Sequence, residues 1–184
     1  VQLFIESCLI SSSEDSLEIV LSNGGYYMGD VDNNNVNGFL NYEHFYEYSD
    51  LESSVISLPL YFDDGENFLL SIETIESELA LGIEDLFTIC VDDFSVFKDQ
   101  GMTFESSEPI VSVEFVKGGY NVFLDYTFVF YEELLSQEFN HFDIFVGFDF
   151  LTKYQIIEEY LNLQTETPGF FSIGKFSTLM RESG

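Results

Sequence analysis

The first 97 residues of this chain contain twenty Asp and Glu residues and no Lys or Arg. The first basic side chain is Lys98, and the remaining 87 residues hold fourteen acids and all five bases. Because like charges repel one another, such a chain is compact only if its carboxylates lie at the surface, bind ions or meet a basic partner. The formal charge of −29 therefore restricts both the fold and the function.

The composition also supplies the apolar side chains of one packed core. Of the 184 residues, 46% are apolar, and they include 21 Phe and 11 Tyr. Such a chain buries enough apolar surface to fold, which excludes an acidic disordered tail. The length predicts a single domain over residues 1–184. The charge argues against direct binding of nucleic acid and against attachment to an anionic membrane surface.

The hydropathy pattern shows no stretch of about 18 to 20 apolar residues, which is the length needed to span a bilayer. The N-terminal residues also lack the pattern of a secretory leader, so the sequence favours a cytoplasmic protein. Cys8 and Cys90 form no CxxC or Cys/His metal spacing. We expect both to be small buried hydrophobic residues in strand-like segments.

The N-terminal part has the composition of antiparallel strands. Residues 1–10 and 16–21 are rich in long and β-branched apolar side chains, and the polar cluster 11–15 between them predicts a hairpin. Asn23-Gly24-Gly25 supplies the positive φ angles of a tight turn. Asp63-Asp64-Gly65 predicts a second turn, between strands at 55–62 and 68–70.

A helical period begins at Ser71, which is a suitable N-cap residue. Ile72, Ile75, Leu79, Ile83 and Leu86 recur at three- and four-residue steps, which predicts one apolar face of a helix over 71–87. A strand is expected to follow at 88–91.

The second half predicts a long hairpin from residues 110–116 and 120–130, joined at Lys117-Gly118-Gly119. We expect Val111, Val113 and Phe115 on one side of the first strand, and the even-numbered residues 120–130 to share one side of the second. Further elements are expected as a short helix at 132–139, a buried strand at 142–148, a helix at 152–163 and an edge strand at 170–176. This order predicts an α+β fold, mainly antiparallel sheet with two or three helices packed on it.

Residues 143–154 read DIFVGFDFLTKY and are similar to the C-terminal strand-and-helix motif of retroelement aspartic proteases. The chain has no Asp-Thr/Ser-Gly triplet, which carries the activity in that family, so the segment predicts only a strand-to-helix junction. No motif for an activated nucleophile, a catalytic zinc or a phosphate loop occurs either. The two histidines, His44 and His141, are expected to be structural or surface residues, and the chain is expected not to be an enzyme.

A possible metal ligand set lies in the Asn-rich segment after residue 29. Asp30, Asp32 and Asn34 alternate in the manner of oxygen ligands for calcium, and the segment resembles EF-hand and dockerin-type loops. It departs from the EF-hand pattern with Asn35 at the sixth position and Asn41 at the twelfth. A plain Asn-rich surface turn is the alternative, and no other cofactor is expected.

The remaining feature is the display of carboxylates around the helix predicted at 71–87. Glu73, Glu76 and Glu84 are expected to point away from its apolar stripe, with Glu78 and Asp85 beside them. Carboxylates three or four residues apart are spaced on a scale similar to that of phosphates along a DNA strand. The expected partner-binding residues are these five and the acids of the flanking turns, which are Asp63, Asp64, Glu66, Asp92 and Asp93.

These features favour a non-enzymatic acidic inhibitor that binds the basic groove of a nucleic-acid-binding protein or nuclease. Two settings share this physics: a phage or mobile-element DNA mimic acting against a host defence protein, and an immunity protein acting against a toxin nuclease. The alternative is a structural or interaction module with no inhibitory role, such as a virion component or a secreted calcium-binding component.

Overall fold

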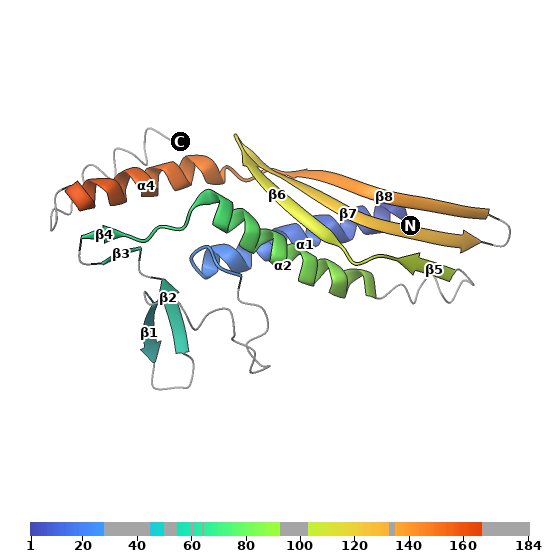
Figure 1. Cartoon of the computed structure of the whole chain (residues 1–184), viewed down its shortest axis with the longest axis horizontal. Coiled ribbons are helices and arrows are strands. Elements are labelled where there is room, and N and C mark those ends of the chain that lie inside the picture. The colour runs from blue at the N-terminus through green and yellow to red at the C-terminus, as the bar shows by residue number, and fades with distance from the viewer. Residues whose placement is uncertain are drawn as a thin grey trace.

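The computed structural model describes residues 1–27, 45–49, 55–59, 61–63, 65–92, 103–132 and 135–166. These residues form an α+β fold in which helices pack against an antiparallel sheet, as the sequence predicts (Figure 1). The helices of the described part are α1 (Gln2–Ser22), α2 (Ile72–Asp92) and α4 (Phe150–Glu166). The strands of its main sheet are β5 (Thr103–Ser106), β6 (Ile110–Val116), β7 (Gly119–Glu132) and β8 (Leu135–Val146).

The centre of the main sheet is the long strand β7. Strands β6 and β5 pair in succession with one of its edges, and β8 pairs with the other, all antiparallel. The predicted hairpin of β6 and β7 is confirmed, because Val111, Val113 and Phe115 lie opposite Leu124, Val122 and Tyr120. These six side chains therefore share one face of the sheet.

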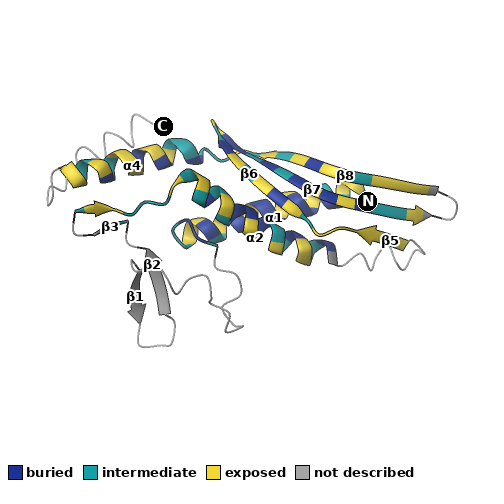
Figure 2. Ribbon diagram, in the orientation of Figure 1, coloured by how far each residue is buried: buried dark blue, intermediate teal, exposed yellow. Residues whose placement is uncertain are grey.

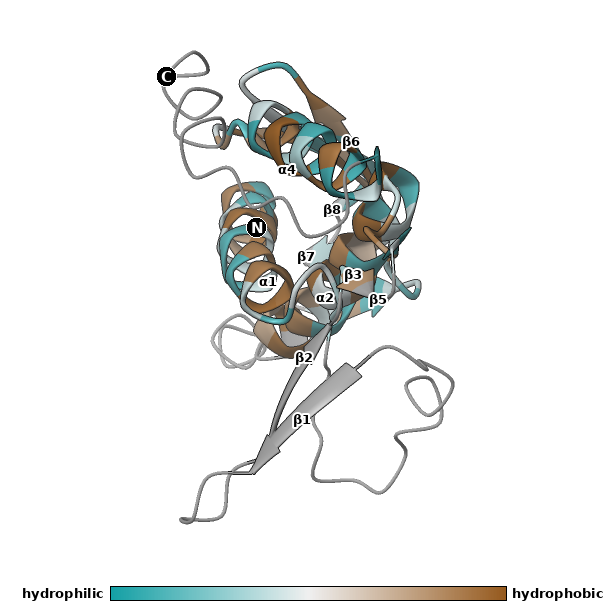
Figure 3. Cartoon of the chain, turned by 90° about the vertical axis from the view of Figure 1, so that its left-hand side faces the viewer, coloured by the Kyte–Doolittle hydropathy of each residue, from teal (hydrophilic) through white to brown (hydrophobic). Residues whose placement is uncertain are grey.

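Helices α1 and α2 cover this face, and the core lies between the two layers (Figures 1 and 2). The Tyr120 hydroxyl donates a hydrogen bond of 2.9 Å to the Ser13 carbonyl of α1, and burial raises the pKa of this phenol. Phe87 of α2 meets Tyr126 edge-on, with ring centroids 5.3 Å apart. In the view of Figure 3, α4 lies to one side of the pair formed by α1 and α2.

Helix α1 replaces the hairpin that the sequence predicts over residues 1–21, and that prediction is wrong. Its apolar residues point to both sides, with Leu3 80% exposed and Ile5 and Leu9 fully buried, so no clear helical stripe is visible in the sequence. The predicted turn at 11–15 is instead a middle turn of the helix. The serines of this part of α1 lie where the helix contacts α2.

The two helices approach closely because small residues line their contact. Ser12, Ser13 and Ser16 are buried, and the Ser16 hydroxyl donates a hydrogen bond of 3.2 Å to the Leu79 carbonyl of α2. A Cβ atom at Gly82 would collide with Ser16 Oγ and with the Tyr27 ring. Helix α1 ends at the predicted glycine turn, where Gly24 and Gly25 have φ angles of 67° and 97° and the Gly25 N–H bonds the Val20 carbonyl at 2.8 Å.

Two further predictions in the second half of the chain are wrong. Residues 88–91 belong to α2 and are not a strand, since the helical stripe continues through Phe87 and Val91 into the core. The helix predicted over 132–139 is instead the end of β7 and the start of β8, which pair from Glu132↔Leu135 onward. Cross-strand packing of Phe130 and Phe139, with centroids 6.4 Å apart, accompanies the extended conformation there.

Shorter elements lie between α1 and α2 along the chain. Strand β1 (Phe45–Ser49) pairs with β2 (Val55–Pro59), and β3 (Phe62–Asp63) pairs with β4 (Glu66–Asn67). The strand-turn-strand unit predicted around Gly65 is confirmed only in part. Gly65 has a φ of 88° and lies between the paired strands β3 and β4, but residues 68–70 are not a strand and β2 pairs with β1. The edge strand predicted at 170–176 lies outside the described residues.

The predicted strand-to-helix junction after β8 is confirmed. Strand β8 ends at Val146 and α4 begins at Phe150, where the Asp149 carboxylate accepts a bond of 3.4 Å from the Thr152 N–H. Hydrogen bonds from Thr152 hold the pKa of Asp149 below its usual value. This carboxylate is therefore the N-cap of α4.

Candidate functional site

Helix α2 is the centre of the predicted partner-binding site, and its local structure follows the prediction. Ser71 caps its first turn, because the Ser71 hydroxyl accepts a bond of 3.2 Å from the Thr74 N–H. Ile75, Leu79 and Ile83 are buried along one side. The acidic residues lie on the other sides of the helix, but they do not form one uniform display.

Glu76 and Glu84 turn toward the sheet. Strand β6 is an edge strand along this part of β7, so alternate N–H groups of β6 point away from the sheet. The Glu84 carboxylate accepts the Val111 N–H and the Glu76 carboxylate accepts the Phe115 N–H, each at 2.7 Å. Two turns of α2 thus supply acceptors to two donors of the sheet edge, and we call this contact the α2–β6 seam.

Glu78 has a comparable role toward the segment that follows α1. Its carboxylate accepts the Tyr27 N–H at 2.9 Å in a partly buried setting. The sequence predicts that Glu76 and Glu84 point away from the apolar stripe, with Glu78 beside them. In the structure each of the three has one oxygen engaged with the backbone of another element. These three acids therefore stabilise the fold.

The other acids of the predicted site are more open. Glu73 and Asp85 on α2 and Glu66 on β4 are exposed. Hydrogen bonds from its own backbone and from Ser71 keep the pKa of Glu73 below its usual value. Asp63 lies in β3 opposite Glu66. Asp92 is the last residue of α2.

The remaining predicted site residues lie outside the described part of the chain. They are the acids Asp64 and Asp93 and the expected calcium ligands Asp30, Asp32 and Asn34. His44 lies outside it as well. Among the residues that the structure does describe, no group of three His, Cys, Asp or Glu is placed to hold a metal ion.

A surface groove of about 500 Å³ follows the α2–β6 seam. Ala80 and Val113 contribute apolar surface, and Glu76 and Glu84 stand on either side of Ala80 along the helix. Strand alternation directs the Val113 N–H to the same side as those of Val111 and Phe115. The groove thus joins acidic side chains to the backbone edge of a strand.

A second, more enclosed pocket of about 220 Å³ lies between the end of α1, the start of α2 and α4. Leu70, Phe148 and Tyr154 are among its mostly apolar lining, and Lys153 lies over the Phe148 ring with its nitrogen 4.8 Å from the centroid. Ligand pockets usually exceed about 300 Å³ and contain convergent polar groups. This pocket therefore gives little support for a small-molecule site.

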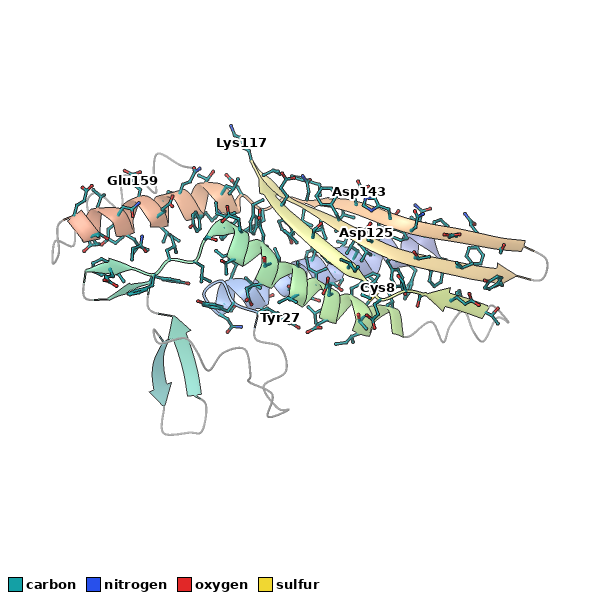
Figure 4. All side chains as sticks on the ribbon, in the orientation of Figure 1. Cys8, Tyr27, Lys117, Asp125, Asp143 and Glu159 are labelled. Carbon is teal, nitrogen blue, oxygen red and sulfur yellow. A yellow bond between two sulfur atoms is a disulfide. The ribbon has the colours of Figure 1, made fainter. Side chains whose placement is uncertain are left out.

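The cysteines form a disulfide between α1 and α2, which the sequence analysis did not anticipate. Cys8 and Cys90 are 82 residues apart in the chain and have Cα atoms 5.7 Å apart (Figure 4). The expectation of two unlinked buried cysteines in strands is wrong, because both lie on helices whose small-residue contact brings the sulfurs together. Cys8, Ser12 and Ser16 recur every four residues on α1, a spacing that could have indicated this contact.

His141 is a surface residue, as predicted, and it lies within β8. Its Nδ1 is 2.9 Å from Asp125 Oδ1 on the neighbouring strand, and the side chains are 50% and 72% exposed. Neither residue lines the two pockets described above. The pair lies on the open face of the sheet, so its geometry does not indicate a catalytic centre.

The residues that alternate with the buried ones in the β6–β7 hairpin form a second surface, which was not among the predicted sites. If Val111, Val113 and Phe115 face the helices, then Ser112 and Glu114 must face outward. We call the side of the sheet turned away from α1 and α2 the outer face. Its acids and exposed apolar side chains were predictable from this alternation, but helix α2 offered a more obvious row of carboxylates.

None of the helices in the described ranges combines the length and hydrophobicity needed to cross a membrane. Comparisons with known protein families, curated proteins and solved structures give no match for this chain. The functional argument therefore rests on the geometry and the charge.

Proposed function

We propose that this chain is a non-enzymatic acidic inhibitor, which binds the basic groove of a nuclease or another nucleic-acid-binding protein. The observation that carries this proposal is the unbalanced charge, −29 with only five Lys and Arg residues. In the described part of the chain, the one side-chain ion pair joins His141 to Asp125. Its carboxylates are thus not neutralised by internal bases.

The physical advantage of such a surface is fast and selective association. Complementary charge steers the approach of a basic protein and raises the association rate, while apolar contacts slow dissociation. A DNA mimic directed against a defence protein and an immunity protein directed against a toxin nuclease would both use these properties. Of the predicted contact residues, Glu66, Glu73 and Asp85 support this role best because they are exposed.

The test is competition between the chain and nucleic acid for a basic groove. Purified protein is added to a nuclease assay, and inhibition is measured against the concentration of duplex DNA or RNA substrate. Competitive inhibition that weakens steeply with salt is expected. Replacement of Glu73 by Gln together with Asp85 by Asn removes the two exposed acids of α2, and it is expected to weaken binding at least tenfold if the helix is in the contact. Inhibition unaffected by substrate concentration would contradict groove binding.

The disulfide supports a second candidate, an interaction module that works outside the reducing cytoplasm. Disulfides persist mainly in oxidising compartments, so Cys8–Cys90 weighs against the cytoplasmic location expected from the sequence. Mass spectrometry of protein alkylated without reduction, taken from its native cells, distinguishes the two locations. A calcium titration of the melting temperature then tests the Asp30 to Asn34 segment, since calcium-dependent stabilisation is not expected of a charge mimic.

A further inference from the structure

The outer face of the main sheet has no helix of the described chain packed on it, in contrast to the inner face. On β7, the inner residues Tyr120, Val122 and Leu124 are fully buried, whereas the outer residue Asp125 is exposed. Figure 2 shows exposed residues interspersed with buried and intermediate ones along β6 and β8. In Figure 4, the side chains of Asp125 and Asp143 lie on the strands of this sheet.

Strand register orders the apolar residues of this face. Phe145 on β8 lies opposite Asn121 of β7, Phe123 of β7 lies opposite Ser112 of β6, and Ile110 on β6 lies opposite Asp125 of β7. The three positions on β7, which are 121, 123 and 125, follow one another at steps of two residues. Phe145, Phe123 and Ile110 thus form a diagonal row across three strands, which we call the apolar ridge. Its ends are open to solvent, with Phe145 59% and Ile110 65% exposed.

One end of the ridge, Phe145, lies close to the backbone of the neighbouring strand. A Cβ atom at Gly119 would collide with the Phe145 ring, so the ring crosses the start of β7 at close range. The central Phe123 is half-buried between its neighbours on β6 and β8.

Carboxylates accompany the ridge on every strand. Asp143 lies opposite Phe123, and Asp125 lies opposite Ile110, so these two acids form a shorter diagonal parallel to the ridge. Glu114 stands opposite Asn121 on the other side of the ridge. Directly opposed side chains in a sheet are about 5 Å apart, so Asp143 lies beside Phe123 and Asp125 lies beside Ile110. His141 is the one titratable base among these rows.

The composition of the outer face matches a protein–protein contact with an apolar centre and a polar rim. The charge selects the partner. A second copy of this chain would bring two molecules of charge −29 together, and nucleic acids and anionic membranes are repelled in the same way. A protein that presents Lys or Arg around an apolar patch is complementary to both the carboxylates and the ridge.

We infer that the outer face docks a basic protein, with Phe145, Phe123 and Ile110 at the centre of the contact and Glu114, Asp125 and Asp143 facing its cationic side chains. This inference rests on the proposed function, because it assigns the surface by which such a partner is bound. The α2–β6 seam is then a structural contact, and the sheet presents the binding surface.

The experiment measures binding of ribonuclease A and micrococcal nuclease, two folded basic nucleases, and of protamine, an unfolded polycation. Ile110→Thr with Phe145→Thr removes the exposed ends of the ridge and keeps strand propensity. We expect nuclease binding at about 0.15 M salt to weaken at least tenfold, which corresponds to about 1.4 kcal/mol. Protamine binding, which needs only charge, is expected to stay unchanged.

A charge variant and a matched control complete the test. Glu114→Gln, Asp125→Asn and Asp143→Asn together are expected to lower the nuclease association rate. The control removes three exposed charges on α1, through Glu14→Gln, Asp15→Asn and Glu18→Gln. Circular dichroism melts verify that each variant is folded.

The outcomes separate the two proposals. If the wild-type chain binds neither nuclease, the proposed function fails. If it binds but the association rate falls equally in the outer-face charge variant and in the α1 control, the rate depends on the overall charge and the outer face is not the docking surface. If the ridge variant loses as much affinity for protamine as for the nucleases, the role of the ridge is refuted. Selective loss in both outer-face variants supports the inference.

Discussion

The α2–β6 seam and the outer face both place carboxylates beside strands, but the carboxylates act differently. At the seam, Glu76 and Glu84 accept backbone N–H groups of β6 at 2.7 Å, so helix α2 supplies acceptors to this edge of the sheet. On the outer face, Glu114 and Asp143 are exposed among side chains of neighbouring strands. A strand edge offers N–H donors in the plane of the sheet, whereas a strand face offers only side chains. The direction of approach therefore decides whether an acid stabilises the fold or stays open for a partner.

The largest effect is expected from a charge placed on the wrong side of the β6–β8 sheet. Phe115→Asp puts a carboxylate at a position that is 6% exposed, stacked on Phe150 with centroids 4.4 Å apart, and should unfold the domain. Phe145→Asp on the outer face is the matched control and should leave a folded protein. Thermal melts followed by circular dichroism check both. A folded Phe115→Asp variant with an unchanged melt would contradict this assignment of the faces.

A smaller effect is expected from removal of the seam acceptors. Glu76→Ala with Glu84→Ala leaves the N–H groups of Phe115 and Val111 without their partners, which should cost about 3 kcal/mol in total. Urea unfolding measures this loss. The double Gln variant keeps an acceptor at each site and should recover most of it. If the Ala and Gln variants are equally stable, the seam bonds do not hold the sheet edge.

The helix cap at Asp149 gives a third, smaller effect, and it depends on pH. Hydrogen bonds from Thr152 lower the folded-state pKa of Asp149, so its stabilisation is present above the unfolded pKa and is lost as pH falls through the folded value. Stability should rise from pH 7 to about pH 5 because repulsion among the carboxylates weakens. It should fall below about pH 4, where the stabilisation by the Asp149 cap begins to be lost. Asp149→Ala should lower the stability at pH 7, whereas Asn should retain the cap and reduce the acid loss. Maximum stability at pH 8 and low salt would contradict the repulsion argument.

The smallest effect is expected from salt, and it compares the two regions directly. Added salt screens the exposed acids and should raise the melting temperature of the wild-type protein slightly. The increase should be smaller in the variant with Glu114→Gln, Asp125→Asn and Asp143→Asn, because part of the repulsion is already removed. The salt-dependent increase in melting temperature should be unchanged when Glu76 and Glu84 are replaced by Gln, if their main role is to accept the hydrogen bonds of the seam. Equal salt responses in all three proteins would mean that the regions do not differ electrostatically.

The parts of the fold with strong local periodicity were predictable. Helix α2, the β6–β7 hairpin and α4 each repeat their apolar residues at the period of their secondary structure, and each was confirmed. Helix α1 was not predictable in this way, because Leu3 and Ile10 are exposed while Ser12 and Ser13 are buried. Its serines are inside because they let two helix backbones approach, which is a property of the pair and not of the segment.

The candidate site was less predictable for the same reason. Which acids of α2 accept backbone hydrogen bonds depends on the strand edge that lies beside the helix. The two N–H donors are 27 and 39 residues further along the chain than the acids that accept them. The pairing of Cys8 with Cys90 likewise depends on helix packing across 82 residues. The outward position of Glu114, by contrast, follows from simple alternation once the strand is assigned.

The Cys8–Cys90 disulfide joins two points that enclose nearly half of the chain. A protease that cuts once within this enclosed stretch would produce two fragments that remain covalently connected until the bond is reduced. When the cut falls between α1 and α2, each fragment would carry one of the two packed helices, so the nicked molecule could keep its α1–α2 contact and its sheet. On a gel, the nick would be invisible without reductant and would separate the fragments after reduction. The crosslink thus keeps the two halves of a molecule nicked between the helices joined until the disulfide is reduced.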